Sequence, residues 1–257
     1  MRRMRIGISR PSFEEGDNEE IFRLAAAMGF EGVQVKPHQY DPLGIEPERF
    51  RAAYGELAAL GRGGAIVYPG HEYRTWLEKL PRYLEFVKGI GGEQLCICAG
   101  IRREHVDADG VRGIANVLNE LGKRAVEAGA VISLHNHADT IVETVEDIAA
   151  LFEHIDPQYC GLTFDTAHAA KGGVKDLAGT LEHYRAFVNN VHLKDVTADG
   201  AFCPIGTGTL DLPAVLAKLR AWDYKEWLIV DEESKGVPVR EAFEASVGFL
   251  RRHGVMI

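Results

Sequence analysis

The chain has 257 residues, of which 46% are hydrophobic and 26% are charged, a composition typical of a globular protein with a sizeable core. Its formal net charge of −9 disfavours a nucleic-acid partner, because phosphate binding needs a basic face. No uncharged apolar run approaches the roughly 20 residues that cross a bilayer, and the first residues lack the apolar core of a signal peptide. We therefore expect a cytoplasmic protein with no membrane partner.

Eight short apolar runs, each bounded by glycine or polar residues, have the pattern of buried parallel strands. In chain order they cover residues 4–9, 32–36, 64–68, 94–99, 130–135, 161–165, 190–194 and 227–231. Helical patterns follow them, at residues 18–28, 46–60, 74–87, 114–128, 144–155, 174–188, 212–222 and 238–253. Pro81 predicts a kink or break in the third helix, and Thr144 with Asp147 predicts a capping box at the start of the fifth.

The alternation of strand and helix repeats eight times along the chain, which predicts an α/β fold of the single (β/α)8 TIM-barrel type. No linker or shift in composition divides the sequence, so residues 1–257 are expected to form one catalytic domain. An open doubly wound sheet is the alternative, but it normally carries a glycine-rich turn after its first strand. Residues 9–13 read Ser-Arg-Pro-Ser-Phe instead, which favours the barrel.

Histidines and carboxylates gather at the carboxyl ends of the predicted strands. Six of the ten histidines lie there: His38, His71, His135, His137, His168 and His192. A single histidine usually has a structural role, but packing does not explain six at one end of a barrel. The carboxylates in the same places are Glu143, Asp165, Asp231, Glu232 and Glu233. Imidazoles mixed with carboxylates suit one divalent ion such as Mn, Co or Zn better than they suit Mg or Ca.

Five groups of residues carry a family resemblance. They are Leu-His-Asn-His at 134–137, Phe-Asp-Thr-Ala-His at 164–168, Val-His-Leu-Lys-Asp at 191–195, Pro-Ile-Gly-Thr-Gly at 204–208 and Tyr-Lys-Glu-Trp-Leu-Ile-Val-Asp at 224–231. In this order and spacing, the chain resembles the xylose-isomerase-like TIM-barrel superfamily of sugar isomerases and epimerases, which has an inosose-dehydratase-like branch. The resemblance implies one divalent metal ion held by four side chains from strands five to eight.

Carried over residue by residue, the resemblance implies that Asp165 and His192 are metal ligands. Many members have a glutamate on strand five, where this chain has His135. The inosose-dehydratase-like branch has a glutamate several residues after a histidine-rich end of strand five, and Glu143 fits that arrangement. The other interpretation of Glu143 is a first-turn helix residue that the helix dipole favours.

On strand eight, the resemblance implies a metal ligand at Asp231. Glu232 and Glu233 follow directly, and a bulge in the strand would let either of them take its place. A regular strand cannot point both Asp231 and Glu232 into the barrel, because side chains alternate between its two faces. The residues implied as substrate contacts are His168, Lys194, His135, His137, His71 and Lys36.

The implied activity is that of a sugar isomerase or epimerase. A divalent metal ion would polarise a carbonyl so that the adjacent carbon loses a proton and an enediolate forms. Glu143 and either Asp231 or Glu232 would exchange that proton. The alternative is a metal-dependent dehydratase or lyase acting on a keto-inositol or 3-keto sugar, with a strand-end histidine (His135, His137 or His168) as the acid.

Two other classes are weaker alternatives. A DNA-repair endonuclease of the same superfamily would need a basic DNA-binding face, and the charge of −9 disfavours it. A sugar-binding module without catalysis would use the metal ion only as structural support. The expected partner is therefore a small sugar or sugar-derived molecule, and a homo-oligomer is compatible with these features.

Overall fold

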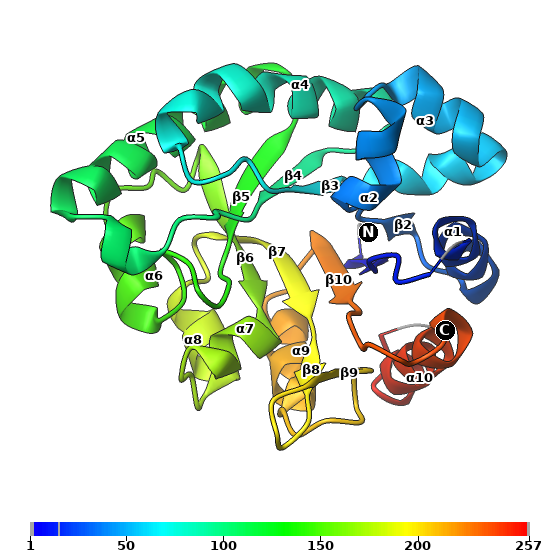
Figure 1. Ribbon diagram of the computed structural model, residues 1–257. Coiled ribbons are helices and arrows are strands. Elements are labelled where there is room, and N and C mark those ends of the chain that lie inside the picture. Colours follow the sequence, from blue (N-terminus) through cyan, green and yellow to red (C-terminus); the bar gives the residue numbers. More distant parts are fainter. Residues whose placement is uncertain (1–2, 15, 256–257) are drawn as a thin grey trace.

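The computed structural model describes residues 3–14 and 16–255. The strands of its main sheet are β1 Arg5–Ser9, β2 Gly32–Val33, β3 Ala65–Val67, β4 Gln94–Ile97, β5 Val131–His135, β6 Cys160–Asp165, β7 Val188–Leu193 and β10 Trp227–Asp231. They are parallel and hydrogen-bonded in the order β2-β1-β10-β7-β6-β5-β4-β3. A parallel bridge between Val35, just after β2, and Ala65 of β3 joins the two ends of this order. The sheet therefore closes into a barrel (Figure 1).

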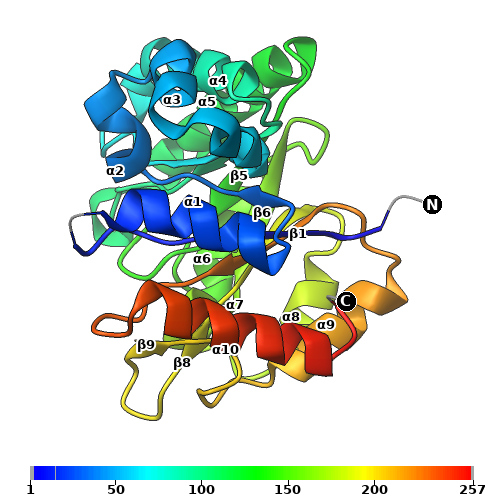
Figure 2. The same cartoon turned by 90° about the vertical axis from the view of Figure 1, so that its right-hand side faces the viewer.

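Helices surround the barrel on its outer side (Figures 1 and 2). They are α1 Asp17–Met28, α2 Pro37–Tyr40, α3 Pro47–Tyr54, α4 Trp76–Gly89, α5 Ala108–Glu127, α6 Val145–Phe152, α7 Thr166–Lys171, α8 Leu177–His183, α9 Leu212–Ala221 and α10 Val239–Arg252. A small antiparallel hairpin, β8 Asp195–Val196 with β9 Phe202–Cys203, follows β7. Within residues 3–14 and 16–255, no helix combines the length and apolar character needed to cross a membrane.

The predicted TIM barrel is confirmed, and a strand occurs in each of the eight predicted runs. The second predicted helix is shorter than expected. It ends as α3 at Tyr54, and the chain continues as a 3-10 helix over Gly55–Gly63. Gly55 has a φ of 55° and a ψ of −132°, a conformation that glycine adopts readily and that ends the α-helix.

The kink or break predicted at Pro81 is not seen as a helix boundary, because α4 continues through this residue. A proline inside a helix leaves the carbonyl four residues earlier without its usual N–H donor. Here that carbonyl belongs to Leu77, and the Arg124 side chain of α5 donates to it at 3.4 Å. A neighbouring helix therefore supplies the donor that proline lacks.

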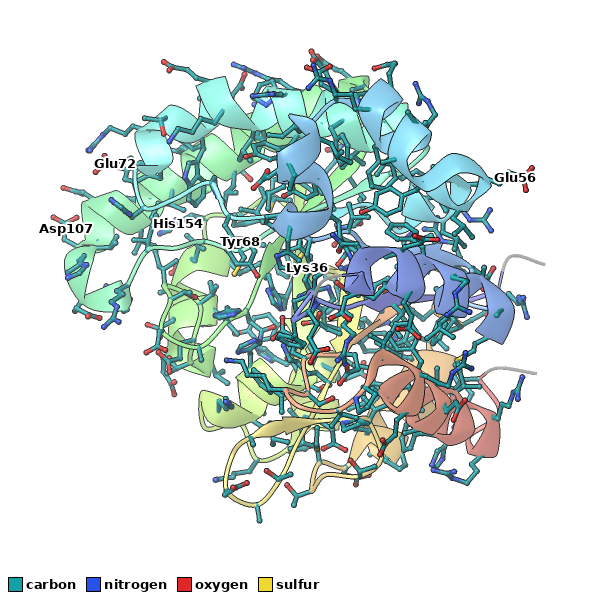
Figure 3. The ribbon with its side chains drawn as sticks, turned by 45° about the vertical axis from the view of Figure 1, so that its right-hand side comes forward. Lys36, Glu56, Tyr68, Glu72, Asp107 and His154 are labelled. Carbon is teal, nitrogen blue, oxygen red and sulfur yellow. The ribbon has the colours of Figure 1, made fainter. Side chains whose placement is uncertain are left out.

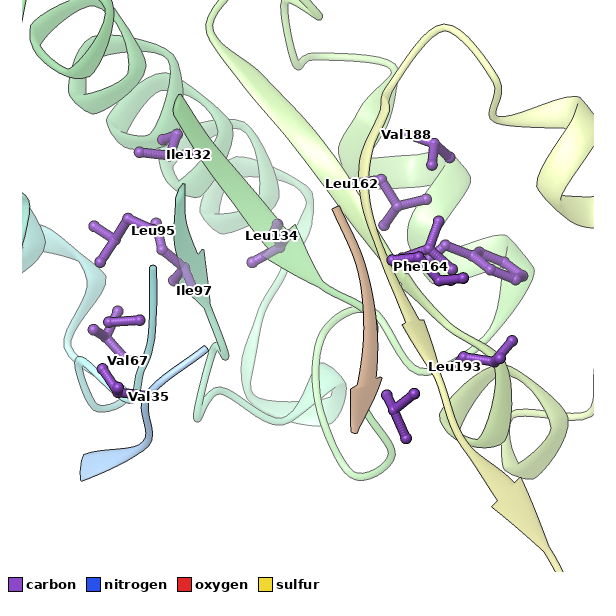
Figure 4. Packing of buried hydrophobic residues seen from close by; sticks show 14 of the residues in the cluster. Val35, Val67, Leu95, Ile97, Ile132, Leu134, Leu162, Phe164, Val188 and Leu193 are labelled. Atoms are coloured by element: carbon purple, nitrogen blue, oxygen red, sulfur yellow. The ribbon is translucent and has the colours of Figure 1, made fainter. Parts of the chain in front are cut away.

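Alternation of side chains along the strands separates an apolar outer layer from a polar interior. Leu134, Phe164 and Leu193 belong to the main hydrophobic cluster, and Figure 4 shows them with other buried residues of the sheet. Their neighbours in sequence, Ser133 and Thr163, lie on the other face and hydrogen-bond to each other across β5 and β6. This interior polar layer leads up to the carboxyl ends of the strands, where active sites of such barrels lie.

Candidate active site

The carboxyl ends of β5, β6 and β7 bring together three buried side chains. They are His135, Asp165 and His192, whose nearest nitrogen and oxygen atoms all lie within 4.8 Å of one another. Asp165 Oδ2 is 3.3 Å from His135 Nε2 and 3.8 Å from His192 Nδ1. Asp165 and His192 are direct partners in the register of β6 and β7, so the sheet itself sets this separation.

Asp165 is held by contacts on both sides. Its Oδ1 atom accepts the backbone N–H of His168 at 2.8 Å and so caps α7, which leaves Oδ2 to face the two histidines. The Asn136 side chain pairs with the Asp165 backbone, accepting its N–H at 2.7 Å and donating to its carbonyl at 3.1 Å. The carboxylate is therefore fixed before any ligand arrives.

One ring nitrogen of His192 forms a hydrogen bond with a side chain of the barrel interior. Its Nε2 atom lies 2.7 Å from Oε1 of Gln34, whose own Nε2 donates to the Gly63 carbonyl at 3.3 Å. That second hydrogen bond orients the Gln34 amide so that its oxygen faces the ring and accepts the Nε2 proton. The other ring nitrogen, Nδ1, then carries a lone pair directed at Asp165 and Asp231, and it has no hydrogen-bond partner among the described residues.

Next to this cluster, two lysines and two carboxylates form a closed set of ion pairs. Lys36 Nζ lies 2.8 Å from Asp231 Oδ1 and 2.7 Å from Glu233 Oε1. Lys194 Nζ lies 3.0 Å from Asp231 Oδ2 and 2.6 Å from Glu233 Oε2. Asp231 Oδ2 is also 3.8 Å from His192 Nδ1, so Asp231 links the ion pairs to the cluster. Figure 3 shows Lys36 near Tyr68, whose ring lies at the end of β3.

The pKa directions agree with this arrangement of charges. Burial alone would lower the pKa of Lys194, but Asp231 and Glu233 raise it, so the side chain stays charged. Burial alone would raise the pKa of Asp231, and the two lysines bring it well below its usual value. Burial is the main cause that lowers the pKa of His192 to about 3 and that of His168 to about 2. Both imidazoles are therefore neutral near pH 7, which is the form that binds metal ions.

His135, Asp165 and His192 fit a divalent metal ion. Separations of 3.3 and 3.8 Å between their donor atoms match ligands around one ion with bonds of about 2.1 Å. The unpartnered His192 Nδ1 is the buried polar atom that such an ion would satisfy.

The structure places the sequence-predicted carboxylates in three different surroundings. Asp231 points into the barrel beside the cluster, as described above. Glu232 points the other way, where it pairs with the buried Arg10 and accepts from Ser234. Glu143 is half-buried in the turn before α6, and none of its side-chain atoms takes part in an ion pair or hydrogen bond with the described residues. Among the described residues, the cluster therefore includes His135, which we expected as a substrate contact, and does not include Glu143, which we expected as a ligand.

The predicted substrate contacts also separate into groups. Lys36, Lys194 and His168 are buried at the mouth of the barrel. The rings of His137 and His168 stack, with their centroids 3.8 Å apart, and His168 Nε2 has no hydrogen-bond partner among the described residues. His71 is exposed in the loop after β3, and the structure does not bring it to the cluster.

Two contributors to the mouth were missed in the sequence. Glu233 was considered only as a substitute ligand, yet side-chain alternation after Asp231 places it, and not Glu232, on the interior side. Phe202 lies on the β8–β9 hairpin, with its ring 4.1 Å from Lys194 Nζ and 5.3 Å from the His168 ring. No local pattern marks Phe202, because its position depends on how the loop between β7 and α9 folds back.

Comparison with known proteins identifies the family to which the sequence is similar. A family model described as "Xylose isomerase-like TIM barrel" matches residues 22–253. An inosose dehydratase from Geobacillus kaustophilus is 36% identical over 143 residues, which cover 49% of this chain and 44% of that protein. The chain thus spans about half the length of the curated relatives it matches.

Solved structures give a similar result for the fold. The 3-keto-D-glucoside 4-epimerase YcjR from E. coli has a TM-score of 0.77 and 22% identity, with 97% of this chain and 100% of that chain covered. A D-allulose 3-epimerase from Methylomonas sp. has a TM-score of 0.77 and 15% identity, with 98% and 99% covered. At these identities, the likeness shows a common fold.

Proposed function

Because the chain belongs to the xylose isomerase-like TIM-barrel family, we propose that it is a metal-dependent sugar isomerase or epimerase. In the proposed reaction, a carbon next to a carbonyl loses a proton, an enediolate forms, and the proton returns at another position or on the other face. The observation that carries this proposal is the cluster of His135, Asp165 and His192 beside the Lys194–Asp231 ion pair. It combines donors for a metal ion, a buried cation and carboxylates in one barrel mouth.

The proposed roles follow from where each group lies. A divalent ion held by His135, Asp165 and His192, with Asp231 or Glu143 as a further ligand, would supply Lewis acidity toward the substrate carbonyl. Lys194 places a positive charge near the position where substrate oxygens gain negative charge. Asp231 and Glu143 are the proposed groups that accept and return the proton. The pairing of Glu232 with Arg10 supports a structural role for that residue instead.

The charge of the mouth supports an anionic intermediate. Two ammonium groups (Lys36, Lys194) and three carboxylates (Asp165, Asp231, Glu233) together carry one net negative charge. A bound divalent ion reverses this to one net positive charge. Buried charge is costly unless it is balanced, so the loaded site favours a reacting group that is neutral at first and gains one negative charge during the reaction.

A dehydratase acting on a keto-inositol or 3-keto sugar is the second candidate. It shares the metal ion and the proton removal, and differs only in that the intermediate loses a leaving group. The matched relative named inosose dehydratase supports this candidate. The acid of this candidate would be a strand-end histidine, and because burial lowers the pKa of both His137 and His168, the acid would have to be the N–H of a neutral imidazole.

Solvent deuterium exchange tests the step that both candidates share. The Mn-loaded protein would be incubated in D2O with a panel of ketoses, keto-inositols, 3-keto glycosides and keto-uronates, and the products followed by NMR and mass spectrometry. Deuterium next to the carbonyl with unchanged composition indicates an isomerase or epimerase. Loss of one water indicates the dehydratase. The absence of exchange and of water loss across the panel would contradict the proposal.

Two variants link the exchange to the cluster. Asp165→Asn should lower the exchange rate by at least about 100-fold, because it removes a charged metal donor whose loss costs roughly 3 kcal/mol. Asp109→Asn makes the same chemical change on the exposed first turn of α5 and should leave the rate unchanged. Equal rates for the two variants would show that the cluster is not the reacting site.

A further inference from the structure

Lys36 and Lys194 bind two carboxylates at the same time. One lies deeper in the barrel, in an inner position, and the other lies nearer the solvent, in an outer position. The inner one is Asp231, which gives one oxygen to each lysine at 2.8 and 3.0 Å. The outer one is Glu233, which also gives one oxygen to each lysine, at 2.7 and 2.6 Å. The outer position is therefore built to take a carboxylate in a bridging geometry, with one ammonium donor for each oxygen.

Access distinguishes the two carboxylates. Asp231 is the last residue of β10 and its side chain is 1% exposed. The Glu233 side chain is 22% exposed, and the residue lies in the loop after β10, outside the sheet ladder. The Lys36 and Lys194 side chains are only 3% and 1% exposed. Buried ammonium groups need anionic partners, so the outer position has to be filled, but its occupant sits on the side that faces solvent.

Phe202 restricts the direction from which another anion can arrive. Its ring lies 4.1 Å from Lys194 Nζ, a cation–π contact that covers one side of the ammonium group. Asp231 covers the interior side. Glu233 Oε2, at 2.6 Å, is the third side-chain contact of Lys194 Nζ.

We propose that Lys36 and Lys194 form a carboxylate-binding site, which Glu233 occupies in the free protein and a carboxylate of the substrate occupies in the complex. The assignment to a substrate rests on the proposed function, and it narrows that function to sugar or cyclitol derivatives that carry a carboxylate, such as keto-uronates. The replacement of one carboxylate by another keeps the charge of the mouth unchanged. Glu233 is then an ion-pair partner of the two lysines that the substrate carboxylate displaces.

Chemical rescue of a variant tests the site without any catalysis. Glu233→Ala empties the outer position, and sodium acetate is the probe that would refill it in the metal-free protein. Acetate should raise the melting temperature of this variant by about 2–4 °C more than sodium chloride at equal ionic strength, because it binds only the folded state. Equal melting temperatures of this variant in acetate and in chloride would contradict the proposed carboxylate-binding site.

Glu233→Gln is the matched control, since its side chain still fills the outer position and leaves no room for acetate. It should therefore show no difference between the two salts. If Glu233→Ala does not fold in chloride, recovery of its folded circular dichroism spectrum in acetate is the same test. A rescue of equal size in Glu233→Gln would show that acetate acts elsewhere, which also contradicts the site.

The substrate class is tested in the deuterium-exchange assay with a matched pair, a keto-uronate and the corresponding neutral keto sugar. The keto-uronate should have a KM lower by about tenfold or more, the size of one charged hydrogen bond. Lys36→Met should remove most of this difference. Equal KM values for the two substrates in the natural protein would overturn the substrate assignment. Acetate rescue without any exchange would leave the site standing and contradict the proposed function instead.

Discussion

Asp165 serves two purposes because its two carboxylate oxygens face different partners. Oδ1 caps α7 through the His168 backbone N–H, and Oδ2 faces His135 and His192. The motif Asp-Thr-Ala-His thus encodes both the start of a short helix and one proposed metal donor. Burial would raise the pKa of Asp165, but interactions with His168, His135 and Lys194 lower it, so the carboxylate is ionised.

Gln34 is expected to determine how well His192 binds a metal ion. Its oxygen accepts the Nε2 proton and so directs the Nδ1 lone pair toward the cluster. Gln34→Leu removes this acceptor, and it should weaken metal binding by about 10–100-fold, as is typical for partners of ligating histidines. Competition with a fluorescent chelator measures the affinity directly.

Gln94→Leu is the control for Gln34→Leu. Gln94 is another buried glutamine of the barrel interior, but it donates to Ser133 and does not contact His192. Its substitution should leave the metal affinity within about threefold of the natural protein while it lowers stability. A similar loss of affinity in both variants would mean that Gln34 acts through general packing and not through the ring proton.

At the level of elements, side chains continue the sheet beyond its last backbone hydrogen bonds. Asn136 pairs with the Asp165 backbone between β5 and β6. Thr166 does the same between β6 and β7, since its hydroxyl accepts the Lys194 N–H at 2.9 Å and donates to the Lys194 carbonyl. The strand ends therefore stay in register where the functional side chains begin.

Asp195 should control the loop that carries Phe202. Its carboxylate accepts the backbone N–H groups of Gly206, Gly208 and Leu210, at 3.0, 3.1 and 3.2 Å. Asp195→Ala leaves these donors without an acceptor, which costs about 1–3 kcal/mol of folding free energy and should speed hydrogen exchange at the three amides. Exchange read by mass spectrometry and urea denaturation measure the two effects.

The control for this loop is Asp211→Ala. Asp211 caps α9 by accepting the Ala214 N–H, so its loss should cost about 1 kcal/mol. The amides of Gly206, Gly208 and Leu210 should keep their protection in this variant. If they also keep it in Asp195→Ala, the loop is held by other contacts.

At the level of the whole molecule, two buried neutral histidines should make the metal-free protein less stable at acid pH. Burial lowers the pKa of His192 to about 3 and that of His168 to about 2, whereas an unfolded imidazole has a pKa of about 6.5. The unfolded state therefore binds protons first. The contribution of the two neutral rings to the free energy of unfolding should be fully present above about pH 6.5. It should decrease as the pH falls, by up to roughly 1.4 kcal/mol per pH unit for each histidine.

Urea denaturation of the chelator-treated protein between about pH 7 and about pH 5 measures this slope. His168→Gln removes one of the titrating rings and should reduce the slope. The carboxylates of Asp165 and Asp231 should not contribute to the pH dependence of stability in this range. Asp165 and Asp231 have lowered pKa values and lose their contribution only below about pH 4. A stability that does not change with pH would contradict buried neutral rings.

Several elements could be predicted from the sequence because they depend on local patterns. The eight apolar runs predicted the strands, and Thr144 with Asp147 predicted the capping box that the structure has. The gathering of His135, Asp165 and His192 also followed from their places at strand ends, since parallel strands in a barrel end on one face. The 3-10 segment after Tyr54 and the continuation of α4 through Pro81 were not predicted, because the geometry of Gly55 and a hydrogen bond from Arg124 of another helix decide them.

The sequence by itself determined the barrel, its polar mouth and the residue types available there, because strand and helix periods and strand order are properties of the chain. The tertiary structure alone decided which of these residues meet. Glu232 pairs with Arg10 whereas Glu233 pairs with the lysines, and Gln34, which follows β2, contacts His192 of β7. The reason is that such pairings depend on distances across the closed barrel and on competition among buried charges, neither of which a local pattern contains.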